Sequence, residues 1–298
     1  FLRWLEAEDL SVGNFLQLQR QADAAVQYGF GRAAEARAPG HSVRSGEEAR
    51  SEFYGHVNLL GPERLVRPLS VGTMYANTPT AYPFPNRLFA EGRSAGAAVG
   101  YAHFDGSMTH STLPLDLALG GVDFVEVFQF GELKADRWYE LLNAGFRVTG
   151  VAGSDFPANL SRFKPWPRAV PLLGPERTLV KADVGPGRSA YDAWVEGVRR
   201  GAAVVSNGPL LDLVVEGRGP GAVVDLVRES TSVSGEARAV SHRPLEALEV
   251  VVNGRVVSSV EGDGSRTELR LPFTLPATGS VWVAARVRAR RVGNEPVI

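Results

Sequence analysis

The side chains in this sequence that can bind a metal or move a proton are histidines and carboxylates. The chain contains no cysteine, which excludes a disulfide framework, a cysteine nucleophile and every thiolate zinc site. Imidazole and carboxylate groups that converge from strand ends suit Zn²⁺, Mn²⁺ or Fe²⁺ with one position open to water. Such a cation lowers the pKa of water towards about 7 and polarises carbonyl or phosphoryl oxygens. Hydrolysis is the reaction that these residues predict.

His103 and Asp155 occupy the strongest positions for this chemistry. His103 ends the apolar run AAVGYAH, and Asp155 follows the run FRVTGVAG and a serine. A parallel barrel presents its reactive groups where its strands end, so we predict both as catalytic residues and metal ligands. The alternative for Asp155 is a helix cap or an Asx turn.

Glu48 and His56 form a further pair of candidate ligands, in the segment GEEARSEFYGH. Eight extended residues span about 26 Å, so the two side chains can bind one metal only if the chain turns between them. The spacing alone leaves that question open. Glu47 and Glu52 are alternative ligands in the same segment.

Glu126 lies inside the apolar run VDFVEVFQF, where an ionised carboxylate is costly without a partner. A metal cation would be a natural partner, and a buried arginine would serve as well. We predict Glu126 as another metal ligand.

The segment FPANLSRFKPWPR, directly after Asp155, combines aromatic, proline and cationic residues. Its aromatic rings would form apolar walls, and its guanidinium groups would anchor an anion. A histidine in the loop GSMTHST either reaches the site or is exposed. The predicted substrate-binding residues are Phe156, Arg162, Trp166, Arg168 and His110.

Alternating helices and strands must position these groups. Helical patterns cover residues 86–95, 135–144 and 189–200, and apolar β-prone runs cover 97–103, 122–130 and 146–153. Residues 1–208 are therefore predicted to form one α/β domain. Residues 209–298 alternate with period two between turn residues, which predicts a small all-β, sandwich-like domain. Within it, Asn253-Gly254 predicts a type I′ hairpin.

Composition limits the classes of partner. The 298 residues are 44% hydrophobic with a net charge of −1, so a globular core forms and no general basic field attracts nucleic acid or anionic membrane. No apolar run of about 18 residues occurs, which predicts no membrane span. We expect a small-molecule substrate. The sequence leaves open a homo-oligomer and either a cytoplasmic or a periplasmic location.

Six segments occur in the order GEEARSEFYGHVNLLG, VGYAHFDG, VDFVEVFQF, RVTGVAGSDFP, GPERTLVKA and RRGAAVVSNGPLLDLVV. This order resembles the PHP (polymerase and histidinol phosphatase) superfamily, and within it the carbaryl-hydrolase-like CehA/McbA branch, over nearly the whole chain. The resemblance implies a distorted seven-stranded (β/α) barrel that binds divalent metals at its strand ends, followed by an accessory β domain. It implies as ligands Glu48, His56, His103 and Asp155, with Glu126 in a strand where the family often keeps an acid.

Two features depart from the superfamily pattern. Its members open with an H-x-H ligand pair on the first strand, and this sequence has no such pair. The chain starts at Phe1 rather than Met, which predicts that the first strand lies upstream or that this copy has degenerated. The final D-x-H motif places Pro157 where the histidine would be, and proline cannot bind a metal. We therefore expect one metal ion rather than two or three.

The leading hypothesis is a metal-dependent hydrolase that cleaves an ester, amide, carbamate or phosphoester bond with activated water. Its cofactor would be Zn²⁺ or Mn²⁺, with Fe²⁺ as a further candidate. For a phosphate substrate, Arg162, Lys164 and Arg168 would supply the cations. The alternative is a degenerate barrel that acts as a binding or structural protein through its β domain, which the missing H-x-H pair favours.

Overall fold

A computed structural model describes residues 1–19, 29–51, 54–67, 84–104, 112–156, 173–182, 184–185, 187–226, 232–276 and 279–290. The chain divides into two compact units. Unit 1 consists of Phe1–Val127, Val148–Val151 and Val180–Arg200, and unit 2 of Phe128–Arg147, Ala152–Leu179 and Gly201–Ile298. The domain boundary between residues 208 and 209 stays a prediction.

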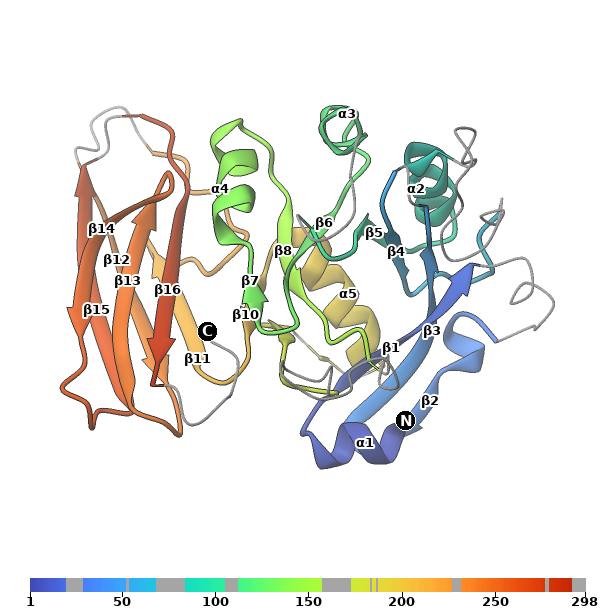
Figure 1. Cartoon of the computed structure of the whole chain (residues 1–298), viewed down its shortest axis with the longest axis horizontal. Coiled ribbons are helices and arrows are strands. Elements are labelled where there is room, and N and C mark those ends of the chain that lie inside the picture. Colours follow the sequence, from blue (N-terminus) through green and yellow to red (C-terminus); the bar gives the residue numbers. More distant parts are fainter. Residues whose placement is uncertain are drawn as a thin grey trace, which may run out of the picture. The chain divides into compact units, whose positions relative to one another are not determined.

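Unit 1 is built on a mixed β-sheet (Figure 1). Its strands are β1 (Val12–Gln19), β2 (Ala36–Ala38), β3 (His41–Ala49), β4 (Val57–Leu60), β5 (Ala98–Tyr101), β6 (Phe124–Gln129) and β8 (Thr149–Ala152). Their order is β1-β3-β4-β5-β6, with β2 paired to β3 and β8 paired to β6. β1 is parallel to β3 and β5 to β6, but β4 is antiparallel to both its neighbours. A (β/α) barrel has parallel strands throughout, so β4 departs from the expected arrangement.

The direction of β4 decides which residues meet at one edge of the sheet. The chain leaves β3 after Ala49 and enters β4 at Val57, and these two residues are paired. Because β4 is antiparallel, it begins at the edge where β3 and β5 end. Residues at the end of β3, before β4 and after β5 therefore lie at the same edge.

Helix α5 (Ala190–Arg200) covers one face of this sheet. Its Tyr191 and Val198 form an apolar cluster with Leu60 of β4, Ala98 of β5 and Phe124 of β6. The buried residues of α5 recur at helical spacing, so the helix presents one apolar stripe to the sheet. Even-numbered residues of β4, β5 and β6 thus face α5.

Helices α2 (Pro85–Ser94) and α3 (Leu113–Ala118) pack on the other face. The fully buried Tyr101 ring of β5 lies 5.4 Å from the Phe89 ring of α2. The Tyr101 hydroxyl donates a hydrogen bond to Asp116 of α3 at 2.5 Å. Because side chains alternate along a strand, odd-numbered residues of β5 belong to this face.

Unit 2 contains two three-stranded antiparallel sheets, in the orders β11-β12-β15 and β14-β13-β16. Their strands are β11 (Leu210–Val215), β12 (Ser232–Val240), β13 (Leu245–Val252), β14 (Arg255–Glu261), β15 (Glu268–Pro276) and β16 (Val283–Ala289). Residues from both sheets form one apolar core, and β15 alternates buried and exposed positions along its whole length. Asn253 and Gly254 both have positive φ at the β13–β14 turn, as a type I′ turn requires. The predicted C-terminal antiparallel sheets are confirmed.

Helix α4 (Ala135–Asn143) packs against these sheets within unit 2. Its Tyr139 contacts Val251 of β13, and the Tyr139 ring lies 4.9 Å from the ring of Trp282. The Trp282 indole N–H donates to the Asn143 side chain at 2.8 Å. The remaining elements are α1 (Leu2–Ala7), the 3₁₀ helix η2 (Arg32–Ala34), β7 (Glu132–Leu133), β9 (Arg177–Val180) and β10 (Ala203–Ser206).

The helices expected at 86–95, 135–144 and 189–200 correspond to α2, α4 and α5. Their apolar residues recur at helical spacing, and a glycine follows each helix within two residues of its end. In the described part of the chain, no helix has the length and apolar character needed to cross a membrane.

A buried ion network ties β3 to α5 in unit 1. The Arg44 side chain is only 2% exposed, and its guanidinium donates to Glu35 and to Asp192, each at 2.7 Å. The same group lies 4.6 Å from the centre of the Tyr191 ring. Buried charges of this kind are costly when one partner is removed.

Replacement of Arg44 by alanine tests this network. We expect Arg44→Ala to lower the free energy of unfolding by about 3 kcal/mol, because the buried Glu35 carboxylate and the partly buried Asp192 carboxylate then lose a cation. Arg238→Ala, which breaks an exposed ion pair with Glu268, should leave the free energy of unfolding nearly unchanged. Urea unfolding followed by circular dichroism measures both variants. If Arg44→Ala unfolds at the same urea concentration as wild type, the network does not stabilise the fold.

Candidate metal centre

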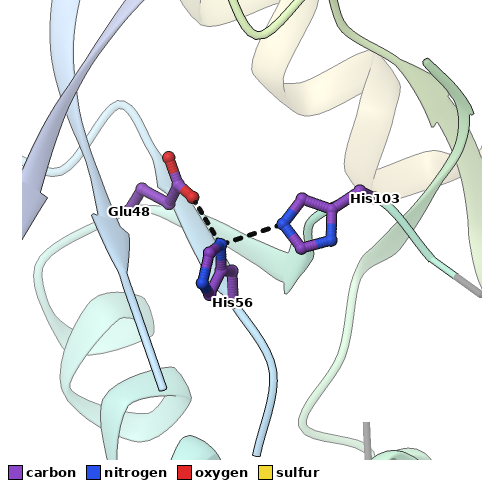
Figure 2. Close-up of side chains that lie close together, drawn as sticks. All are labelled: Glu48, His56 and His103. Atoms are coloured by element: carbon purple, nitrogen blue, oxygen red, sulfur yellow. Dashed lines mark hydrogen bonds and ion pairs between the residues drawn. The ribbon is translucent and has the colours of Figure 1, made fainter. Parts of the chain in front are cut away.

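Three side chains meet where the end of β3, the start of β4 and the end of β5 share an edge (Figure 2). Glu48 belongs to β3, His56 directly precedes β4, and His103 follows β5. Each offers one ligand atom, and these atoms lie within 4.8 Å of one another. The chain turn that the spacing of Glu48 and His56 requires is therefore present.

His56 lies between the other two side chains. Its Nδ1 is 3.0 Å from Glu48 Oε1 and 2.9 Å from His103 Nε2. A single hydrogen on Nδ1 can serve only one of these contacts well. If the proton instead sits on His103 Nε2, the Nδ1 lone pair faces a carboxylate oxygen. With the proton on His56 Nδ1, the contact with His103 or the contact with Glu48 lacks a hydrogen bond. With the proton on His103 Nε2, the contact between His56 and Glu48 lacks one.

The backbone of His103 turns its imidazole towards this cluster. In a regular strand, His103 would follow Tyr101 to the face covered by α2 and α3. Its φ is instead 33°, in the left-handed region that few non-glycine residues adopt. Strained backbone conformations of this kind are frequent at functional sites, where the surrounding structure stabilises them.

Glu126 holds this strained turn. Its Oε2 accepts a hydrogen bond from the His103 backbone N–H at 2.6 Å. The backbone N–H of Phe104 donates to the Glu126 carbonyl at 2.8 Å, so two successive residues of the turn are tied to β6. One partner of the Glu126 carboxylate is thus a backbone N–H. Its role as a metal ligand stays a prediction.

The electrostatics of the cluster suit a cation. Burial alone would raise the pKa of the Glu48 carboxyl, but the hydrogen bond from His56 and the charge of Arg50 lower it to about 2. Burial, together with the charge of protonated His56, lowers the pKa of His103 to about 4. At neutral pH, Glu48 is therefore ionised and the His103 ring is neutral, with one of its two nitrogens unprotonated. These are the protonation states that metal binding requires.

The donor set fits a divalent cation. Two imidazoles and one carboxylate form the ligand set of several catalytic zinc sites and of non-haem iron sites, with further positions open. The His56 Nε2 is also buried without a hydrogen-bond partner among the described residues, which marks the ring as incompletely satisfied. A cation would accept lone pairs from all three side chains at once. The donor set is compatible with Zn²⁺, Mn²⁺ and Fe²⁺.

Arg50 is a member of this site that the sequence interpretation missed. Its Nη2 donates to Glu48 Oε2 at 3.1 Å, and its Nε lies 3.0 Å from Glu48 Oε1. The Arg50 side chain is 12% exposed, so the pair is largely shielded from solvent. Arg50 lies two residues after Glu48, and residues two apart share one face of an extended chain. This spacing could have indicated that Arg50 contacts Glu48.

Asp155 belongs to unit 2 and lies three residues after the end of β8. Its φ of 49° places it in the left-handed region, as at His103. Next to it, the Phe156 backbone N–H approaches Ser154 Oγ at 3.4 Å. The roles of Asp155 as ligand and catalytic residue, and of Phe156 as a substrate contact, stay predictions.

The other candidate residues lie elsewhere or are not described. Glu47 is fully buried, and its Oε1 accepts the Val66 backbone N–H at 2.5 Å rather than joining the cluster. Outside the described residues lie Glu52, His110, Arg162, Lys164, Trp166 and Arg168.

The sequence matches no protein-family model and no curated protein. Several solved structures resemble it, and two of them are described here. One is a two-domain protein containing a predicted PHP-like metal-dependent phosphoesterase from Bacteroides vulgatus ATCC 8482, with 13% identity and a TM-score of 0.37. The other is Endonuclease Q in complex with a 27-mer duplex substrate that has an abasic lesion at the active site, with 13% identity and a TM-score of 0.40.

The two alignments cover 80% and 67% of this chain. They cover 66% and 50% of the other proteins, so this chain spans about two thirds of the first and half of the second. At this identity and these TM-scores, the likenesses identify neither the family nor the activity of this chain.

Substitution of Glu126 separates a ligand from a support for His103. We expect Glu126→Ala to weaken Zn²⁺ binding by about 10- to 100-fold, because the turn that presents the imidazole loosens. Glu126→Gln should bind nearly as well as wild type, since its amide oxygen still accepts the backbone N–H. Isothermal titration calorimetry measures the affinities, with Glu249→Ala in unit 2 as a control of similar burial. Equal losses in the alanine and glutamine variants would make Glu126 a ligand instead.

Proposed function

We propose that this chain is a metal-dependent hydrolase that cleaves an ester, amide, carbamate or phosphoester bond. The observation that carries the proposal is the convergence of three lone-pair donors, from Glu48, His56 and His103, within 4.8 Å of one another. The proposal includes a PHP-type barrel of the CehA/McbA branch. It also includes Asp155 as a further ligand and catalytic residue. Its substrate would be a small molecule.

Each residue of the cluster has a role in holding the centre. When bound, a divalent cation would supply a Lewis acid and an activated water. Glu48 brings the negative charge, and Arg50 fixes the plane of its carboxylate by contacting both oxygens. A carboxylate offers about four lone-pair positions, so the arginine leaves room for a cation. Burial keeps the His103 ring neutral, and its left-handed backbone turns the ring towards the cluster.

Arg50 favours an anionic substrate over a neutral one. Glu48 brings one negative charge, whereas Arg50 brings one positive charge and a divalent cation would bring two more. The site would then be positive, and a guanidinium matches the paired oxygens of a phosphate group. Among the bonds named above, a phosphoester fits this charge best.

A second candidate function is a barrel without catalytic activity that binds a partner through the β domain. The contact that favours it is the ion pair of Arg50 with Glu48, because this pair already neutralises the carboxylate without a metal. Metal binding by the whole chain distinguishes the two candidates.

The first experiment measures metal binding and hydrolysis together. We expect wild-type protein to bind Zn²⁺ or Mn²⁺, and to lose hydrolysis of aryl esters, carbamates and phosphates when a chelator removes the metal. Glu48→Gln and His103→Ala should each weaken binding by at least about 100-fold, because each removes one of three ligands. Glu47→Gln, a neighbouring buried acid that keeps its acceptor oxygen, is the matched control. If elemental analysis finds no bound metal, the hydrolase proposal is wrong and the binding protein without catalytic activity remains.

Arg50 generates a separate expectation about substrate choice. Arg50→Met should lower kcat/KM for an aryl phosphate by about 10- to 100-fold more than kcat/KM for the corresponding aryl carbamate, because only the phosphate loses a charged partner. Arg64→Met, an exposed arginine that contacts Ser94, serves as a control for the loss of a surface charge. A similar decrease in kcat/KM for both substrates would mean that Arg50 only positions Glu48 and does not contact the substrate.

A further inference from the structure

Asn58 is a buried polar residue in the otherwise apolar strand β4, whose sequence is VNLL. It pairs directly with Glu48 across the β3–β4 ladder and with Gly100 across the β4–β5 ladder. Residues directly opposite each other in an antiparallel pair project from the same face of the sheet. His56 precedes Asn58 by two residues and shares that face. Asn58 therefore lies beside the cluster.

The Asn58 amide oxygen has no hydrogen-bond partner in the part of the chain that the structure describes. Oδ1 is buried and accepts no hydrogen bond among the described residues, and the residue as a whole is 7% exposed. A buried amide oxygen that accepts nothing destabilises the fold. Leu60, the next residue on this face, packs in the apolar cluster under α5, so the face accepts an aliphatic side chain. Stability alone would favour a residue like leucine at position 58.

We propose that Asn58 is a positioning residue for the water molecule that attacks the substrate at the Glu48–His56–His103 cluster. Its Oδ1 accepts a hydrogen bond from this water and thereby fixes the direction of the oxygen lone pair. The amide forms no covalent bond and takes up no proton. This inference rests on the proposed hydrolysis and adds a residue that acts on the nucleophile.

The test uses the full chain loaded with Mn²⁺, whose effect on water-proton relaxation reports how fast bound water exchanges. Asn58→Leu removes the acceptor and keeps the branched shape of the side chain, and Asn58→Ala serves if the larger leucine does not fit. Asn58→Asp keeps an acceptor oxygen at the same place. Ser42→Ala is the control, because Ser42 Oγ is also buried without a partner among the described residues.

We expect Asn58→Leu to bind Mn²⁺ with an affinity within about threefold of wild type, while its bound water exchanges faster and kcat falls by about 10- to 100-fold at unchanged KM. Asn58→Asp should restore the slow exchange. Without metal, Asn58→Leu should melt at the same temperature as wild type or higher, since an unsatisfied amide has been removed. Ser42→Ala should change neither water exchange nor kcat.

Three results would overturn the inference. Unchanged water exchange and kcat in Asn58→Leu, with Mn²⁺ binding still dependent on Glu48, would leave Asn58 without a role at the nucleophile. Loss of Mn²⁺ affinity as large as in Glu48→Gln would make Asn58 a ligand itself. A lower melting temperature for the metal-free leucine variant would make Asn58 a structural residue. Failure of wild-type protein to bind Mn²⁺ would instead remove the proposed function, and this inference with it.

Discussion

The antiparallel direction of β4 is the constraint on which the candidate centre depends. It brings the chain back after β3, so that His56 stands 3.0 Å from Glu48 although eight positions separate them. It also places the start of β4 against the end of β5, where the Ala102 backbone N–H donates to the His56 carbonyl at 3.1 Å. With a parallel β4, His56 would begin at the opposite edge of the sheet from Glu48 and His103.

Several groups around this edge work against the stability of the fold. His103 adopts a left-handed backbone conformation, which costs on the order of 1 to 3 kcal/mol for a non-glycine residue. The buried His56 Nε2 and Asn58 Oδ1 lack partners among the described residues, and each such group costs about 1 to 3 kcal/mol. Apolar residues cover the same sheet face under α5 without any of these costs. The position of these groups beside Glu48 and His103 supports the proposal of a metal and water at this edge.

The helices and the C-terminal sheets follow from local patterns, and the sequence predicts them well. The 3.6-residue spacing of apolar residues marks α5, and the Asn253-Gly254 pair marks the β13–β14 hairpin, because both signals depend only on neighbouring residues. Strand direction depends on long-range pairing, so the reversal at β4 could not be read from VNLL. The turn at His103 depends on the Glu126 carboxylate, 23 positions further along the chain. For that reason the sequence predicted Glu126 as a ligand, but it did not predict the hydrogen bond by which Glu126 holds the backbone of His103.

The contact of Arg50 with Glu48 bears on whether the cluster is a closed ion network or an open metal site. Burial would raise the pKa of an isolated carboxyl, so Glu48 needs cationic neighbours to remain charged, and Arg50 supplies one. An arginine alone would complete a structural pair, as the cation at Arg44 does for Glu35. At Glu48, however, the neutral His103 ring is also brought within reach by a strained backbone, and an ion pair gains nothing from a neutral ring. A shared cation, as proposed above, would account for the convergence of the second imidazole, whereas the arginine pair does not.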